Sequence, residues 1–169
     1  YTKTGEPDSA LVSYRQALDL RQKNTPPLPD KDKGISDIYN YIGIIYSIKG
    51  DFETALSYYS RSLSIRKRLN DPSAIADSYN NLGIVFKEQA DYERALKYYL
   101  KSISIKETLS EKGLYNKQGL ANSYGNIAVI YKLLGESQKA LEYNFKAVAI
   151  EESLGNRLDA ADTYNNIGI

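Results

Sequence analysis

The strongest constraint on this chain is a short segment that recurs along it. The segment Tyr79–Phe86 has near copies in Tyr39–Tyr46, Tyr124–Tyr131 and Tyr164–Ile169. Each copy except the last is followed within a few residues by a polar break and then a second amphipathic stretch that contains Ala and Tyr. Self-similarity at a period of 20–50 residues is the sequence signature of a repeat architecture. In such arrays each unit contacts only its neighbours, so the core is a continuous seam along the chain.

The spacing within each copy resembles the tetratricopeptide repeat (TPR). Its pattern is an aromatic, then Leu-Gly, another aromatic, an Ala and a last aromatic. The matching residues are Tyr79, Leu82, Gly83, Phe86, Ala95 and Tyr99; Tyr39, Ile42, Gly43, Tyr46, Ala55 and Tyr59; and Tyr124, Ile127, Ala128, Tyr131 and Ala140. Asn144 stands where the pattern has its last aromatic, and the closing Pro is missing. The long period is similar to that of kinesin light chains, Pins-type polarity adaptors and bacterial Rap-type peptide receptors.

The resemblance implies an all-α fold, a right-handed superhelical solenoid of antiparallel helix pairs. We expect the chain, residues 1–169, to be a single TPR array. Its units should cover about residues 1–33 (partial), 34–71, 72–115, 116–155 and 156–169 (partial). Because residue 1 is not Met and both ends fall inside a unit, we expect a piece excised from a longer chain. Such ends expose apolar surface, which favours end-to-end self-association.

Capping residues predict where the helices begin and end. Asp51 and Asp91 are good N-caps for helices that begin at Phe52 and Tyr92. Asn70-Asp71-Pro72 should end one helix and start the next. The connection at residues 24–29 contains three prolines, which predicts a loop. The connection at residues 111–117 has none and could instead lengthen a helix.

Small residues recur in the middle of each first helix, at Gly43, Gly83 and Ala128. Gly inside a helix costs up to ~1 kcal/mol relative to Ala. We expect a close approach of the partner helix, at Ala55, Ala95 and Ala140, to offset this cost, with the aromatics filling the space around the pair.

Composition excludes several functional classes. The net charge is +1, which gives no electrostatic footprint for nucleic acid. No apolar run is long enough to span a bilayer. His and Cys are absent, which removes the commonest general base, thiolate nucleophiles and the commonest zinc ligands. We therefore expect no cofactor, no metal, no nucleic acid and no membrane insertion, and a soluble compartment, the cytoplasm before an extracytoplasmic one.

No catalytic constellation is recognisable in the sequence. Phosphate-binding Gly-rich loops, HExxH and GxSxG are all missing. The adjacent acids Glu151 and Glu152 point to different sides of a helix, and a solvated face is the default expectation for them. We therefore predict that the chain is not an enzyme.

Polar residues of the first helices are the candidate binding site. In the family these helices line the concave face of the superhelix, so equivalent positions form rows along a groove. Asn has a low helix propensity, so its recurrence in the middle of the first helices needs an explanation. One reason is binding of an extended peptide, whose backbone an amide can grip as donor and acceptor, as matching asparagines do in the peptide-receptor relatives. The other reasons are duplication and hydrogen bonds between repeats. The predicted groove residues are Asp37, Asn40, Ile44, Asp77, Asn80, Asn81, Ile84, Lys87, Asn126, Val129, Lys132 and Asn165.

The sequence therefore predicts a non-catalytic module that binds a protein or an extended peptide segment. Such a module would be the sensory or adaptor part of a larger protein. The alternative is a structural spacer or self-assembly scaffold whose groove has no ligand. Gly125 interrupts the row of Asn40, Asn80 and Asn165, and we expect it to leave a notch for a bulkier ligand group.

Overall fold

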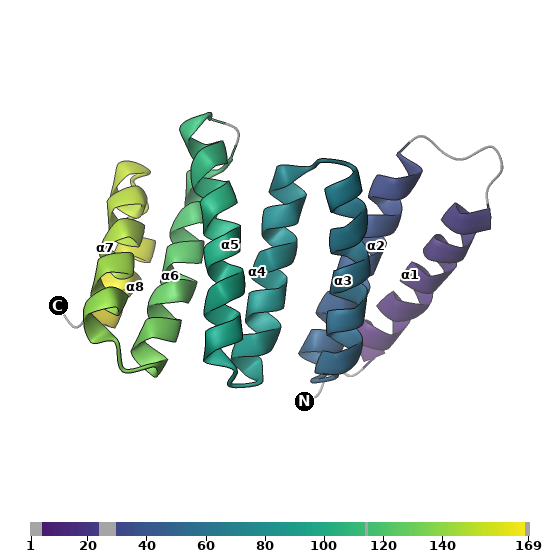
Figure 1. Cartoon of the computed structure of the whole chain (residues 1–169), viewed down its shortest axis with the longest axis horizontal. Helices are drawn as coiled ribbons and strands as arrows, with labels where there is room; N and C mark the ends of the chain where they lie inside the picture. Colours follow the sequence, from purple (N-terminus) through teal and green to yellow (C-terminus); the bar gives the residue numbers. More distant parts are fainter. Residues whose placement is uncertain (1–4, 24–29, 114, 168–169) are drawn as a thin grey trace. The chain divides into compact units, whose positions relative to one another are not determined.

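The computed structural model describes residues 5–23, 30–113 and 115–167, and these residues form α-helices joined by turns (Figure 1). The helices are α1 (Gly5–Lys23), α2 (Lys31–Ile48), α3 (Phe52–Arg68), α4 (Pro72–Glu88), α5 (Tyr92–Glu111), α6 (Lys117–Leu133), α7 (Ser137–Ser153) and α8 (Arg157–Ile167). The proline-rich connection and the terminal residues Tyr1 and Ile169, on which the expectation of end-to-end association rests, lie outside the described residues. None of the described helices is long and apolar enough to cross a membrane.

The predicted caps are confirmed. The Asp51 carboxylate accepts a hydrogen bond from the Thr54 backbone N–H at 3.1 Å, and Asp91 accepts one from Arg94 at 3.0 Å. Asn70 ends α3 in the left-handed conformation, with φ 51°. The connection without proline was expected to lengthen a helix, and α5 does continue to Glu111. The next helix, α6, begins at Lys117.

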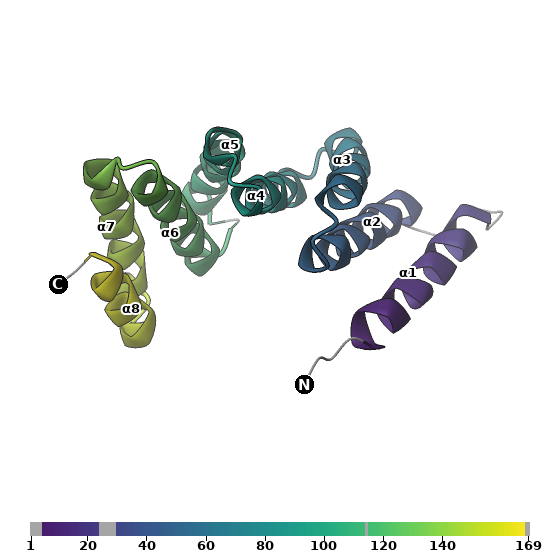
Figure 2. The same ribbon diagram turned by 90° about the horizontal axis from the view of Figure 1, so that it is seen from below.

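The chain divides into two compact units, residues 1–81 and 82–169, each described by itself here. In the first unit α2 and α3 are an antiparallel pair that lies side by side in both views (Figures 1 and 2). Helix α1 packs on α2 through a cluster that includes Leu11, Ile38, Ile42 and Ile45. The first unit therefore contains the helix-pair packing that the repeat predicts.

In the second unit α6 and α7 form the same kind of antiparallel pair, and they pack between α5 on one side and α8 on the other. Ile127 and Ile130 of α6 are completely buried, and Val148 of α7 is almost so. One face of α6 therefore packs into the core, and another face is exposed to solvent.

The mid-helix glycines lie against a tyrosine ring. A Cβ added at Gly43 would be 2.7 Å from the ring of Tyr59, and one added at Gly83 would be 2.8 Å from the ring of Tyr99. The expectation that the aromatics fill the space around the small residues is confirmed at these two glycines. The ring occupies the space that a side chain at the glycine would need.

Candidate binding site

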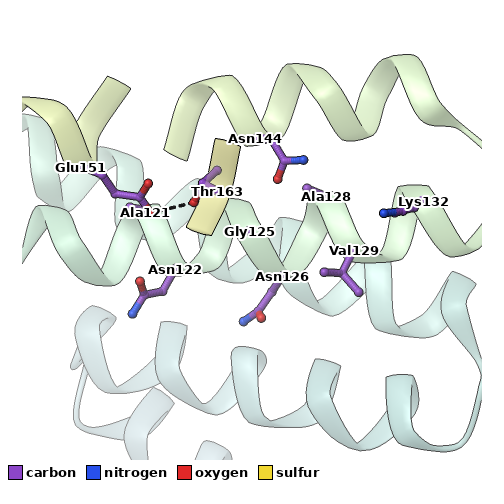
Figure 3. Close-up of a pocket in the computed structure, with 10 residues that line it drawn as sticks. All are labelled: Ala121, Asn122, Gly125, Asn126, Ala128, Val129, Lys132, Asn144, Glu151 and Thr163. Carbon is purple, nitrogen blue, oxygen red and sulfur yellow. Dashed lines mark hydrogen bonds between the residues drawn. The ribbon is translucent and has the colours of Figure 1, made fainter. Parts of the chain in front are cut away.

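The predicted residues of α6 lie on one side of an open cavity in the second unit. Asn126 is half-buried, Val129 is 46% exposed and Lys132 is exposed. The cavity has a volume of about 700 Å³ (Figure 3). Its lining residues are Ala121, Asn122, Gly125, Asn126, Ala128, Val129, Lys132, Asn144, Glu151 and Thr163. Three Asn amides therefore border the same space, each able to donate and accept hydrogen bonds.

The cavity adjoins the place where this repeat departs from the TPR pattern. In the third repeat Tyr99, only 1% exposed, fills the space beside Gly83. In the fourth repeat the equivalent residues are Asn144 and Ala128, and both line the cavity. An Asn side chain is much smaller than a Tyr ring, so the substitution leaves room beside α6. Gly125 also lines the cavity, and nothing lies within 4 Å of where its Cβ would be.

The charges of the cavity lie at opposite ends, with the Glu151 carboxylate at one and Lys132 at the other (Figure 3). Glu151 is only 5% exposed, so the expectation that it lies on a solvated face is wrong. The cause is packing: α8 covers this end of α7, and the Thr163 hydroxyl of α8 donates to Glu151 Oε1 at 3.3 Å. Glu152, the neighbouring acid, is exposed as expected.

In the first unit the predicted polar residues surround a buried arginine. The Arg66 guanidinium donates to Asp37 at 3.0 Å, to the Ser78 hydroxyl at 2.8 Å and, more weakly, to Asn40 Oδ1 at 3.5 Å. The Asn81 amide donates to the same Asn40 oxygen at 2.9 Å. Asn40 and Asn81 therefore connect α2 to α4, which is the hydrogen bonding between repeats that was the alternative to peptide binding. Asp37 has a cationic partner within the chain.

The remaining predicted residues are distributed over both units. In the first unit Ile44 and Asn80 are half-buried and Asp77 is exposed. In the second unit Ile84 is half-buried, and Lys87 is half-buried beside Glu88, with 3.0 Å between the charged atoms. Asn165 of α8 is exposed.

Sequence reasoning missed Arg66, Asn144, Glu151 and Thr163 as members of these clusters. The signal was present, because Arg66, Lys106 and Glu151 follow the buried alanines 55, 95 and 140 at the same distance in sequence. This position is basic at Arg66 and Lys106 but acidic at Glu151, which is a change of chemistry. Its burial could not be read from one amphipathic helix alone.

Comparisons with known proteins identify the family. Tetratricopeptide-repeat models match residues 34–108 and 121–154, together more than half of the chain. The chain therefore belongs to the tetratricopeptide-repeat family, and its structural neighbours support the longer-repeat type. The prediction of an all-α helical solenoid is likewise confirmed. No curated protein matches the sequence.

Three crystal structures illustrate the similarity. BtubC (BKLC) from P. vanneervenii has a TM-score of 0.79 and 26% identity, over 89% of this chain and 59% of BtubC. Aspartyl phosphate phosphatase F from Bacillus subtilis has a TM-score of 0.79 and 19% identity, over 91% of this chain and 38% of the phosphatase. The TPR domain of Arabidopsis FLU has a TM-score of 0.64 and 24% identity, over 72% of this chain and 98% of that domain. The chain thus spans under two thirds of the first two proteins, and the last two similarities concern the fold alone.

Protein interaction is the function typical of this family, which is generally non-catalytic. Among the described residues, no group of three or more Asp and Glu side chains is arranged to hold a metal ion.

Proposed function

We propose that this chain is a non-catalytic binding module that holds a protein or an extended peptide segment along the polar faces of its first helices, α2, α4, α6 and α8. It would serve as the sensory or adaptor part of a larger protein. Membership of a family of interaction modules supports the general class. The observation that carries the specific proposal is the amide-bordered cavity on α6.

The cavity offers the two kinds of contact that an extended peptide needs. Asn122, Asn126 and Asn144 border it with amides, and each can pair with a peptide N–H or C=O. Such a hydrogen bond contributes a net ~0.5–1.5 kcal/mol. Val129 adds exposed apolar surface on which a ligand side chain can rest.

The proposed surface comprises the first-helix residues of both units, which contribute amides, an apolar row and charged rims. Asn40 and Asn81 have a second task in it, since their mutual hydrogen bond holds α2 and α4 together. Its members are Asp37, Asn40, Ile44, Asp77, Asn80 and Asn81 in the first unit, and Ile84, Lys87, Asn126, Val129, Lys132 and Asn165 in the second.

The test is capture of peptides from a random library displayed on beads. The parent is compared with Asn126→Ala/Lys132→Ala, which removes one amide and one ammonium from the cavity. The matched control, Gln138→Ala/Lys97→Ala, removes the same groups from exposed positions that do not line it. We choose Asn126 over Asn40 because Asn40 has hydrogen bonds within the fold, so its loss would also weaken the helix packing.

We expect the cavity variant to lose most captured sequences at an unchanged melting temperature, and the control to keep them. Equal capture by parent and cavity variant would move the binding surface away from α6. Capture by none of the three proteins would favour the spacer or scaffold.

A further inference from the structure

One buried position changes its charge between repeats. Arg66 of α3, Lys106 of α5 and Glu151 of α7 occupy equivalent places in their helices, and they are 6%, 4% and 5% exposed. A charged group buried to this degree is stable only when it is paired or fully hydrogen-bonded. The partners of each therefore show what the position requires.

The two basic residues have partners inside the chain. Arg66 donates to Asp37, Ser78 and the Ala74 carbonyl oxygen, the last at 3.1 Å. Lys106 donates to the Ser123 hydroxyl at 3.0 Å, and its ammonium lies 5.3 Å from the centre of the Tyr115 ring. The charge of Arg66 is thus held by α2 and α4, and that of Lys106 by Ser123 of α6 and by Tyr115, which precedes α6.

Glu151 has no such set of partners. Its Oε1 accepts the single hydrogen bond from Thr163, and among the described residues its Oε2 is buried without any hydrogen-bond partner. An ionised carboxylate has about four acceptor sites, so most of its capacity is unused. Lys132, the cation that lines the same cavity, lies at its far end (Figure 3).

The residue with the unused acceptor lines an open space. The repeat that carries the reversed charge is also the one in which Asn144 replaces the tyrosine, and both residues line the cavity of about 700 Å³. Gly125 lies on the α6 side with nothing within 4 Å of a Cβ position, so a chain of several heavy atoms could pass it. The cavity thus extends from solvent to the largely buried Glu151 side chain.

We propose that this cavity is a binding site for a cationic nitrogen group, an ammonium or guanidinium, which pairs with Glu151 at one end of the cavity. The favoured source is a lysine or arginine side chain of a bound peptide, and to that extent the inference rests on the proposed function. The cation replaces the one that Arg66 and Lys106 provide from within the chain. Its stem lies along Val129 and Ala128, while the amides of Asn126 and Asn144 hold the peptide backbone.

The test is an NMR titration of the ¹⁵N-labelled chain with defined probes. Two capped heptapeptides of serine and alanine differ only at the central residue, lysine in one and glutamine in the other. Butylammonium and butanol form the corresponding pair of free small molecules. Binding is followed at the backbone amides of Gly125, Asn144 and Thr163.

Two variants change the site in different ways. Glu151→Gln keeps the shape of the side chain and removes its charge. Ala128→Gly/Asn144→Tyr introduces the Gly–Tyr pair of the second and third repeats, so that a ring narrows the cavity beside residue 128 while Glu151 stays in place. The dispersion of each spectrum tests whether the variant is folded, and only folded variants are compared with the parent.

We expect the lysine peptide to bind the parent at least about tenfold more tightly than the glutamine peptide. The reason is that glutamine cannot form the charge-assisted hydrogen bond between an ammonium and the buried Glu151 carboxylate. Both variants should abolish that preference, and added salt should weaken it. If butylammonium binds as tightly as the lysine peptide, with the same dependence on Glu151, the cation site stands and its source is a free amine.

Equal affinity for the lysine and glutamine peptides would overturn the cation site while leaving the proposed function intact. A lysine preference that survives Glu151→Gln would also overturn it. Failure of every cationic probe to bind would do the same, and the library capture with Asn126→Ala/Lys132→Ala decides the proposed function separately.

Discussion

The third and fourth repeats have the same kind of helix pair, and three of the positions at which they differ concern the space between the two helices and the buried charge. These are Gly83, Tyr99 and Lys106 in the third repeat, and Ala128, Asn144 and Glu151 in the fourth. In the third repeat a ring fills the space beside the glycine, and the buried ammonium has an acceptor in the next helix. In the fourth the ring is absent, a cavity remains, and the buried carboxylate has a free oxygen.

The comparison teaches that a repeat can acquire a cavity by losing a core side chain. Burial of a tyrosine contributes to stability through its large apolar area. A repeat array can lose this contribution in one unit, because its stability is approximately a sum over units and their interfaces. The helices of the open repeat are then held in place by α5 and α8, which pack on α6 and α7.

The largest expected effect is on the closed arrangement. Gly83→Leu should lower the free energy of unfolding by more than the ~1–3 kcal/mol that overpacking usually costs. The reason is that even a Cβ would lie 2.8 Å from the Tyr99 ring. Gly125→Leu is the matched control, since nothing lies within 4 Å of a Cβ there. Thermal melts of the two variants should differ widely, and equal melting temperatures would show that the ring does not fill the site.

The next largest effect concerns the two positions, 128 and 144, that are Gly and Tyr in the second and third repeats. Asn144→Tyr alone should cost ~1–3 kcal/mol, because the Ala128 methyl group occupies the place that the ring needs. Adding Ala128→Gly should recover that loss, with a coupling energy of ~0.5–3 kcal/mol between the two sites. Urea unfolding of the parent, both single variants and the double variant measures the coupling. Additive effects would mean that the fourth repeat packs differently from the third.

Sequence periodicity predicted the fold closely, because each helix is specified by local signals. Caps such as Asp51 and Asp91 and the break at Asn70 mark the helix ends, and their chemistry acts within a few residues. The repeat pattern also placed Gly83 in the packed seam. It also placed Tyr99 among the aromatics around that glycine, but how close the ring lies depends on how two helices meet.

The site was less predictable for the same reason. Asn126, Val129 and Lys132 were found because they lie on one face of a single helix. Glu151 was misread as solvated, because its burial comes from α8, a different helix. Asn40 was misjudged in the other direction. Its position on α2 suggested a side-chain amide free to bind a ligand, but its Oδ1 accepts a hydrogen bond from Asn81 of α4.

Alkaline pH should destabilise the repeats that keep the tyrosine. Burial raises the pKa of Tyr59 to about 12, and it also raises the pKa of Tyr99 above its ordinary value of 10.0. Above pH 10 the unfolded state releases these protons first, so the folded state binds more protons and its stability falls as the pH rises. The Tyr99 hydroxyl also has no hydrogen-bond partner among the described residues.

Tyr99→Phe should therefore leave stability at pH 7 nearly unchanged and make it less sensitive to pH above 10. The expected slope of the parent is up to ~1.4 kcal/mol per pH unit for each such tyrosine. Urea unfolding at neutral and alkaline pH measures both quantities. A variant with the same alkaline slope as the parent would show that Tyr99 ionises as readily in the folded state as in the unfolded one.

The smallest effect tests the open repeat directly. Gly125→Ala should stabilise the chain by up to ~1 kcal/mol, because Ala is the better helix residue and the added methyl group meets no neighbour. The same substitution at Gly83 should destabilise, since its methyl group would meet the Tyr99 ring. Thermal melts of the pair should therefore shift in opposite directions. A loss of stability at Gly125 would mean that the cavity is smaller than described, and it would remove the space on which both binding proposals depend.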